Sequence, residues 1–161
     1  MIKTTICALV ILLSLCKPTH SQATAYTIEG DSPYDDLGRS IASLKDVNGD
    51  GYADLAIGVP VDHVGGYNAG SVRVVSGYDG TTLSRVDGTT LEGLGRLVKN
   101  VGDTNGDGID DLVVASNNNG TGSILLLSGA GLTSLGVLPV SVQAGDYLVA
   151  ACSVGYVDSN G

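Results

Sequence analysis

Two short loops rich in Asp and Asn carry the clearest chemical pattern in the sequence. In the first loop, which starts at Asp46, oxygen-bearing side chains occupy positions 1, 3, 5 and 9, and Gly51 stands at position 6. Alternate side chains of a tight loop converge on one point, where the backbone carbonyl of position 7 adds a further oxygen. Hard oxygen donors in this number favour Ca²⁺. The predicted ligands are Asp46, Asn48, Asp50, Tyr52 through its carbonyl group, and Asp54.

The same pattern returns 57 residues later, in the loop that starts at Asp103 and has Gly108 at position 6. Three carboxylates within nine residues repel one another unless a cation neutralises them, so we expect about two bound Ca²⁺ ions rather than two empty polar turns. Asp110, at position 8, is an additional acid that we expect to face solvent. The predicted ligands of the second loop are Asp103, Asn105, Asp107, Ile109 through its carbonyl group, and Asp111.

Other interpretations lack the residues that they need. An EF-hand loop ends with Glu at position 12, where Ile57 and Val114 stand in this sequence. Beyond residue 23, His63 is the single histidine, and neither Gly-x-Ser-x-Gly nor His-Glu-x-x-His occurs. We therefore predict that these residues form no catalytic site and that the protein is not an enzyme.

The two loops belong to a longer internal repeat, and this repeat predicts the fold. Turn residues and short apolar runs in the first repeat predict four strands, and four antiparallel strands per repeat are typical of one blade of a β-propeller. The predicted fold class is all-β, with about two blades and the start of a third. The aligned blocks are 37–39 with 94–96, 46–51 with 103–108, 54–57 with 111–114, and 70–77 with 122–129. The predicted strands of the first repeat are residues 38–45, 55–59, 71–76 and 82–87.

Strand direction predicts which loops share an end of a blade. Because neighbouring strands run in opposite directions, the acidic loop at residues 46–54 and the turn at residues 78–80 lie at the same end. We call this the lower end. The longer loop at residues 60–70 lies at the opposite, upper end.

The first 23 residues are predicted to be a secretory signal peptide. Lys3 precedes an apolar run at residues 6–15, which is too short for a membrane span of about twenty residues, and a small-x-small cleavage pattern ends at Ala23. Acylation of Cys16 is an alternative, although the residue before it is larger than a lipobox requires. Cleavage would leave Cys152 as the one cysteine, in an apolar stretch that favours a buried position.

The charge of the chain excludes whole classes of partner. With 17 acidic and 8 basic residues, the net charge is −9. Nucleic acids and anionic membranes would repel such a protein. We therefore expect no nucleic-acid partner and no membrane span, and we interpret residues 24–161 as one exported domain.

These motifs resemble the FG-GAP repeats, which form the seven-bladed propeller at the N-terminus of integrin α chains and occur in many exported bacterial proteins. Leu37-Gly38 and Leu94-Gly95 match the Phe-Gly signature, and Gly58-Val59-Pro60 matches Gly-Ala-Pro. Ala115-Ser116-Asn117 and Val149-Ala150 depart from these signatures in the later repeats. The resemblance divides the domain into repeats at about 28–87, 88–142 and 143–161, the last truncated within a third calcium loop at Asp158 and Asn160.

The resemblance implies a calcium-stabilised, non-catalytic recognition module, secreted or at the cell surface, that binds an extracellular protein or glycan. In this family the ions brace the lower face and ligands meet upper loops, here residues 60–70 with Asp62, His63 and Tyr67. An ordinary solvated loop is the alternative for these three residues. A ring of seven repeats needs more residues than are present, so we interpret the chain as the N-terminal part of a longer propeller. An accessory propeller of a secreted hydrolase whose catalytic domain lies beyond Gly161, or a structural surface repeat, are the other options.

Overall fold

The structure is a computed structural model that describes residues 9–10, 26–118 and 121–138. Every regular element in these ranges is a β-strand. The third acidic loop, Cys16 and Cys152 lie outside the described residues. The strands are β1 (Leu9–Val10), β2 (Thr27–Ile28), β3 (Ser40–Ser43), β4 (Leu55–Val59), β5 (Ser71–Val75), β6 (Thr82–Asp87), β7 (Leu97–Gly102), β8 (Asp111–Asn118), β9 (Thr121–Leu127) and β10 (Ser134–Leu138).

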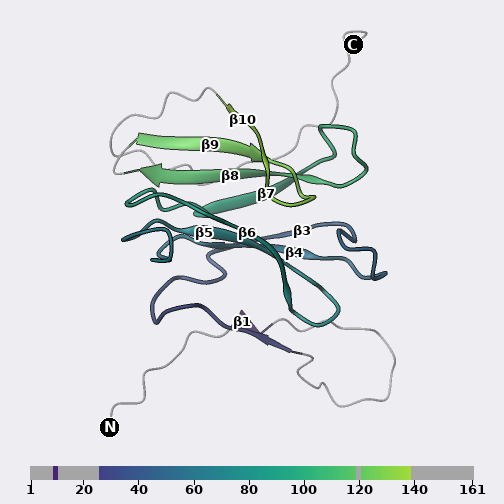
Figure 1. Cartoon of the computed structure of the whole chain (residues 1–161), viewed down its shortest axis with the longest axis horizontal. Helices are drawn as coiled ribbons and strands as arrows, with labels where there is room; N and C mark the ends of the chain where they lie inside the picture. Colours follow the sequence, from purple (N-terminus) through teal and green to yellow (C-terminus); the bar gives the residue numbers. More distant parts are fainter. Residues whose placement is uncertain (1–8, 11–25, 119–120, 139–161) are drawn as a thin grey trace.

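Two four-stranded antiparallel sheets make up most of the described fold (Figure 1). The first has the order β3-β4-β5-β6 and the second the order β7-β8-β9-β10, so each strand pairs with its neighbour in the sequence. We call these sheets the first and the second blade. The predicted all-β fold of four-stranded, propeller-like blades is confirmed, and β3 to β6 coincide closely with the four strands predicted for the first repeat. The described residues form no closed ring.

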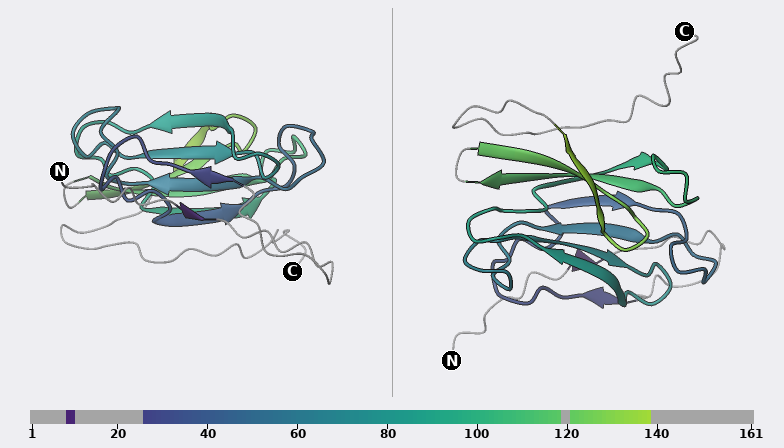
Figure 2. Two further views of the ribbon diagram at one scale, coloured as in Figure 1. Left: turned by 90° about the horizontal axis from the view of Figure 1, so that it is seen from below. Right: turned by 45° about the horizontal axis from the view of Figure 1, so that its top comes forward.

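The two blades lie side by side, as Figure 1 and the right-hand view of Figure 2 show, and one apolar core lies between them. Side chains alternate between the faces of a sheet, so one face of each blade supplies this core. All of β5 is buried, because the other face of the first blade is covered as well. The core residues are Ala42, Leu44, Ala56, Val72 and Val74 from the first blade, and Leu94, Val98, Leu112, Val114, Leu127 and Leu132 from the second blade and the segment before it.

The segment before β3 covers the opposite face of the first blade. Ile28 and Leu37 pack there against Ile57, Val59 and Val75. β2, within this segment, pairs with β1. β1 lies within residues 1–23, the predicted signal peptide. Cleavage of these residues stays a prediction. Among the described residues, no helix is long and apolar enough to cross a membrane.

Two glycines allow the blades to approach each other closely. A Cβ atom on Gly58 would clash with the carbonyl oxygen of Gly95 in the second blade. A Cβ atom on Gly95 would in turn clash with the carbonyl oxygen of Ser71, and Gly95 has a φ of +90°, which disfavours other residues. The glycines of the Leu-Gly and Gly-Val-Pro motifs are therefore needed because the backbones of the two blades are in direct contact there. The position equivalent to Gly58 in the second blade is Ala115.

The upper loop of the first blade also joins the blades. Backbone N–H groups of the connecting segment donate to its carbonyl groups: Leu91 to Tyr67 at 2.8 Å and Gly93 to Asn68 at 3.0 Å. In the second blade the corresponding connection, between β8 and β9, is much shorter. The first blade alone therefore has a long upper loop among the residues that the structure describes.

Candidate metal centre

The first acidic loop is wound around the carboxylate of Asp46. Its Oδ1 accepts hydrogen bonds from the N–H groups of Gly49 at 2.6 Å and Asp50 at 3.1 Å, and its Oδ2 accepts one from Gly51 at 2.7 Å. Gly49 and Gly51 have φ angles of +81° and +87°. Glycine adopts this region without strain, so the spacing of the two glycines fixes the path of the loop.

The other predicted ligands of this loop are held by local hydrogen bonds as well. Asn48 Nδ2 donates to Asp50 Oδ2 at 2.8 Å, and the Tyr52 N–H donates to Asp50 Oδ1 at 2.8 Å. These contacts lower the pKa of Asp50, with the Asn48 hydrogen bond as the largest cause. Asp54 is fully buried, and its Oδ2 accepts from the Val47 N–H at 2.7 Å. Asp50 is therefore an exposed anion and Asp54 a buried acceptor within one loop.

The second loop repeats the hydrogen bonds around Asp46 and Asp50 at the equivalent residues. Asp103 accepts from the N–H groups of Gly106, Asp107 and Gly108 at 2.7, 3.2 and 2.8 Å. Asp107 accepts from Asn105 Nδ2 at 2.9 Å and from the Ile109 N–H at 2.8 Å, and this last bond is the main cause of its lowered pKa. The same residue types at the same spacing thus fold twice into the same loop.

Each loop is also attached to the turn after the third strand of its blade. Ser76 Oγ donates to Asp50 Oδ2 at 2.9 Å, and the Gly77 N–H donates to Asp54 Oδ1 at 3.0 Å. In the second blade, Ser128 Oγ donates to Asp107 Oδ2 at 3.3 Å. These contacts confirm that the two connections share the lower end. Neither serine was among the predicted site residues, although a Ser-Gly pair directly follows the third strand of both repeats.

The two loops differ in the hydrogen bonding of one carboxylate oxygen, Oδ1 of the ninth residue. Asp111 is fully buried, and its Oδ2 accepts from the Thr104 N–H at 2.8 Å and from the Thr104 hydroxyl. Its Oδ1 is buried and has no hydrogen-bond partner among the described residues. An unpaired buried carboxylate oxygen is costly, whereas a cation bound in the loop would satisfy it.

The donor chemistry of both loops fits a hard cation. Within the described ranges no three acidic, histidine or cysteine side chains converge as metal ligands, because the loop aspartates are turned toward backbone N–H groups. Carboxylate and carbonyl oxygens, glycines at the turning points and the unpaired oxygen of Asp111 are nevertheless what a Ca²⁺ loop requires. The candidate ligands are those that the spacing predicts in residues 46–54 and 103–111.

The prediction that Asp110 faces solvent is wrong. Its residue is 7% exposed, and its carboxylate accepts from Lys45 Nζ at 2.7 Å and from Asn100 Nδ2 at 3.0 Å. The hydrogen bond from Lys45 is the main cause of the lowered pKa of Asp110. Lys45 follows β3 in the first blade, so this acid joins the second loop to the neighbouring blade.

At the upper end, Asp62 is buried and engaged within the protein. It accepts from the Val64 N–H at 3.0 Å, from Ser71 Oγ at 2.7 Å and from Arg85 Nη2 at 2.7 Å. Arg73 Nη2 lies 3.5 Å from its Oδ2. Burial raises the pKa of Asp62, but these hydrogen bonds and the two arginines outweigh it, so that the pKa is lowered.

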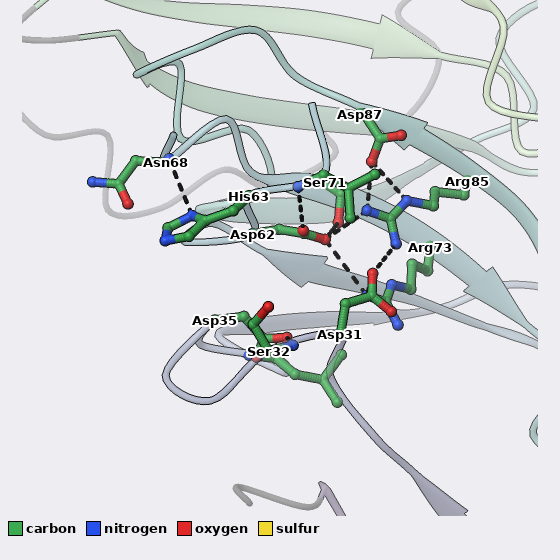
Figure 3. A network of polar contacts seen from close by, with 12 residues as sticks. Asp31, Ser32, Asp35, Asp62, His63, Asn68, Ser71, Arg73, Arg85 and Asp87 are labelled. Carbon is green, nitrogen blue, oxygen red and sulfur yellow. Dashed lines mark hydrogen bonds and ion pairs between the residues drawn. The ribbon is translucent and has the colours of Figure 1, made fainter. Parts of the chain in front are cut away.

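Asp62 belongs to a group of five charged residues, the arginine cluster, which Figure 3 shows. Arg73 and Arg85 lie directly opposite each other on β5 and β6, where like charges repel. Asp31, from the segment before β3, pairs with both of them, at 2.7 Å to Arg73 Nη2. Asp87 completes the cluster at 2.6 Å from Arg85. Shared carboxylates therefore hold the two arginines together.

The other two residues predicted for the upper loop lie at the surface. The rings of His63 and Tyr67 are 5.2 Å apart, and both side chains are exposed. His63 Nδ1 accepts from the Asn68 N–H at 3.2 Å, as Figure 3 shows. His63 and Tyr67 are thus accessible to a partner, whereas Asp62 positions the loop from beneath.

Comparison with known proteins finds one matching family model and several similar proteins. Residues 37–75 match the FG-GAP repeat model. The chain is 28% identical to integrin α-6 of Gallus gallus over 126 residues, which are 75% of this chain and 12% of that protein. It is 32% identical over 90 residues to integrin α-2 of Mus musculus and of Bos taurus, which covers 50% of this chain and 7% of each relative. The chain thus spans only a small part of these relatives. Residues 37–75 thus match an FG-GAP repeat, and the chain is similar in sequence to integrin α subunits.

Proposed function

We propose that the chain is a calcium-binding, non-catalytic recognition module of an exported, integrin α-like propeller. The observation that carries the proposal is the matched pair of acidic loops, of which the second holds a buried Asp111 oxygen that has no partner in the described part of the chain. Local hydrogen bonds orient the same donors in both loops. Two loops that present the same oxygen ligands are suited to an ion that prefers oxygen, such as Ca²⁺.

The distribution of charge supports the same proposal. Ion pairs join Lys45, Arg73 and Arg85 to four aspartates outside the predicted ligand set, namely Asp31, Asp62, Asp87 and Asp110. The loop aspartates accept hydrogen bonds from neutral N–H and O–H groups instead, which do not cancel their charge. A divalent cation would, and it would reduce repulsion among three carboxylates per loop.

The recognition part of the proposal rests on the upper end and on the family. Bound ions would brace the lower ends of the blades and leave the upper loop free to meet a partner. His63 and Tyr67 are the exposed side chains that we assign to such a contact. The similarity to integrin α subunits favours an extracellular protein or glycan as the partner and the cell surface or the medium as the location.

Calorimetric titration of the purified protein with Ca²⁺ tests the metal sites. We expect about two ions per chain, with dissociation constants of about 10⁻⁴–10⁻³ M as in other extracellular modules. Asp50→Asn and Asp107→Asn should each remove one site, because each replaces a charged ligand by a neutral one of the same shape. Absence of calcium heat, together with a melting temperature that a chelator does not change, would refute the proposal.

A further inference from the structure

The two acidic loops differ in how they are joined to the rest of the molecule. At position 8 the first loop has the exposed Ala53, whereas the second has the buried Asp110. Asp110 stands between Ile109 and Asp111, two of the proposed ligands. Its side chain nevertheless points away from the ligand set, to Lys45 of the first blade. The residue therefore belongs to the loop by its backbone and to the blade interface by its side chain.

The contacts of Asp110 continue into a polar seam along β3 and β7. Asn100 Nδ2 donates both to Asp110 Oδ2 at 3.0 Å and to the carbonyl oxygen of Ser43 at 2.8 Å. Farther along the seam, the Val98 N–H donates to Ser40 Oγ at 2.9 Å. The seam thus runs from the second loop to the middle of the interface, through side chains that bond directly to the other blade.

We propose that the second loop is a cation-operated lock between the two blades: an ion bound by residues 103–111 holds Asp110 against Lys45 and Asn100 and so strengthens blade docking. The inference rests on the proposed function, and the buried Asp111 Oδ1, which no described residue pairs with, is the independent sign that this loop takes a ligand. A bound ion fixes the backbone on both sides of Asp110, so less conformational entropy is lost when its side chain pairs across the interface. By linkage, docking of the first blade strengthens ion binding by the same factor.

The first loop lacks this connection. It meets the core between the blades through Val47, which is partly buried there. Its polar side chains bond within the loop and to the turn at Ser76 and Gly77, all in the first blade. An ion in the first loop should therefore stabilise its own blade and act on the interface much more weakly than an ion in the second loop.

Hydrogen exchange of the Val98 amide reports on docking, because this N–H group bonds across the interface. The amides of Ser76 and Ser128, which bond to Thr81 and Thr133 inside the first and the second blade, are internal references. In the full chain, saturating Ca²⁺ should slow exchange of Val98 about tenfold relative to both references, within the range that mass action allows. Asp107→Asn should abolish this slowing, and the matched variant Asp50→Asn should retain most of it.

A second pair of variants separates the connection from the ion site. Asp110→Asn and Lys45→Gln should leave two calorimetric Ca²⁺ sites and yet reduce the slowing of Val98 to less than about threefold. Lys99→Gln, which removes an exposed positive charge from β7, is the control and should retain the tenfold effect. Equal effects of Asp50→Asn and Asp107→Asn, or full slowing in Asp110→Asn and Lys45→Gln, would overturn the lock. Loss of all calcium binding in the unaltered chain would instead refute the proposed function.

Discussion

The two ends of the first blade gather aspartates in opposite ways. At the upper end, Asp31, Asp62 and Asp87 share two arginines, and Asp62 is only 1% exposed. At the lower end, Asp46 and Asp50 are held by backbone N–H groups, and Asp50 remains exposed. At the upper end the chain supplies the cations that neutralise its carboxylates. At the lower end it supplies neutral N–H and O–H donors, which leave the negative charge of Asp46 and Asp50 for an external ion to neutralise.

The repeat explains why the arginine cluster occurs once in the described residues. Arg73 aligns with Leu125 of the second blade, and Leu125 packs against the apolar core between the blades. In the first blade, the face that bears Arg73 meets the segment that carries Asp31. This strand position is thus apolar in the second blade, where the neighbouring blade packs against it. It is charged in the first blade, where the segment that carries Asp31 packs against it.

Of the changes considered, removal of the Arg73 side chain should lower the free energy of unfolding most. Arg73 is 5% exposed, and Arg73→Ala leaves Asp62 buried with one cation fewer. Loss of one partner from a buried ion pair costs about 3–5 kcal/mol of unfolding free energy. Urea unfolding measures this loss. The control Arg39→Ala, an exposed arginine of the same blade, should change stability by less than about 0.5 kcal/mol. Equal losses in the two variants would contradict a role for the cluster.

The second largest effect should come from calcium, which we expect to stabilise the lower end of the blades and not the upper end. At about a hundred times its dissociation constant, an ion adds about 2.7 kcal/mol for each filled site. Because the arginine cluster shares no ligand with the loops, Arg85→Ala should show the same calcium increment as the unaltered chain, within about 0.5 kcal/mol. Thermal unfolding with calcium and with chelator provides the measurement. An increment that shrinks in Arg85→Ala would show that the two ends are coupled.

Acid should weaken the upper end in a defined direction. The folded-state pKa of Asp62 is lowered, so its ionised form stabilises the fold above its unfolded pKa of about 3.9. This contribution is lost as the pH falls from that value through the lower folded pKa. Between about pH 4 and pH 2, the unaltered chain should therefore lose more stability than Asp62→Asn, as measured by denaturant unfolding at each pH. Parallel pH curves would argue against this assignment.

The smallest effect concerns the aromatic pair beside the first loop. The rings of Tyr52 and Tyr78 are 5.1 Å apart and link the acidic loop to the neighbouring turn. Tyr78→Ala should cost about 0.5–1.5 kcal/mol, and Tyr78→Phe, which keeps the ring, should cost less. Chemical denaturation with and without calcium resolves the two variants. A larger cost for the Phe variant than for the Ala variant would exclude ring packing as the reason.

Much of the lower end could be predicted from the sequence because its contacts are local. The hydrogen bonds that shape each loop join residues no more than seven positions apart, such as Val47 and Asp54. Residue type and spacing encode contacts of this kind directly. The four-stranded blades follow from the short apolar runs and from the turn residues between them. The serines at positions 76 and 128 were missed because their partners come from a different connection.

The roles of Asp62 and Asp110 needed the tertiary structure. The two residues occur in polar stretches that look exposed in the sequence, yet they are 1% and 7% exposed. Asp110 meets Lys45 across 65 positions, and Arg73 meets Asp31 across 42. Such pairs form only when whole sheets and segments pack, so no local sequence pattern predicts them.

The sequence by itself determined the repeat, the strands and the shape of both acidic loops, because short-range hydrogen bonds and glycine conformation decide these features. Tertiary packing decided which aspartates the protein neutralises for itself. Asp62 and Asp110 meet arginine or lysine once blades and segments dock, whereas the loop aspartates meet neutral N–H and O–H donors. Charge compensation depends on distance in space rather than in sequence, and distance in space is a property of the folded chain.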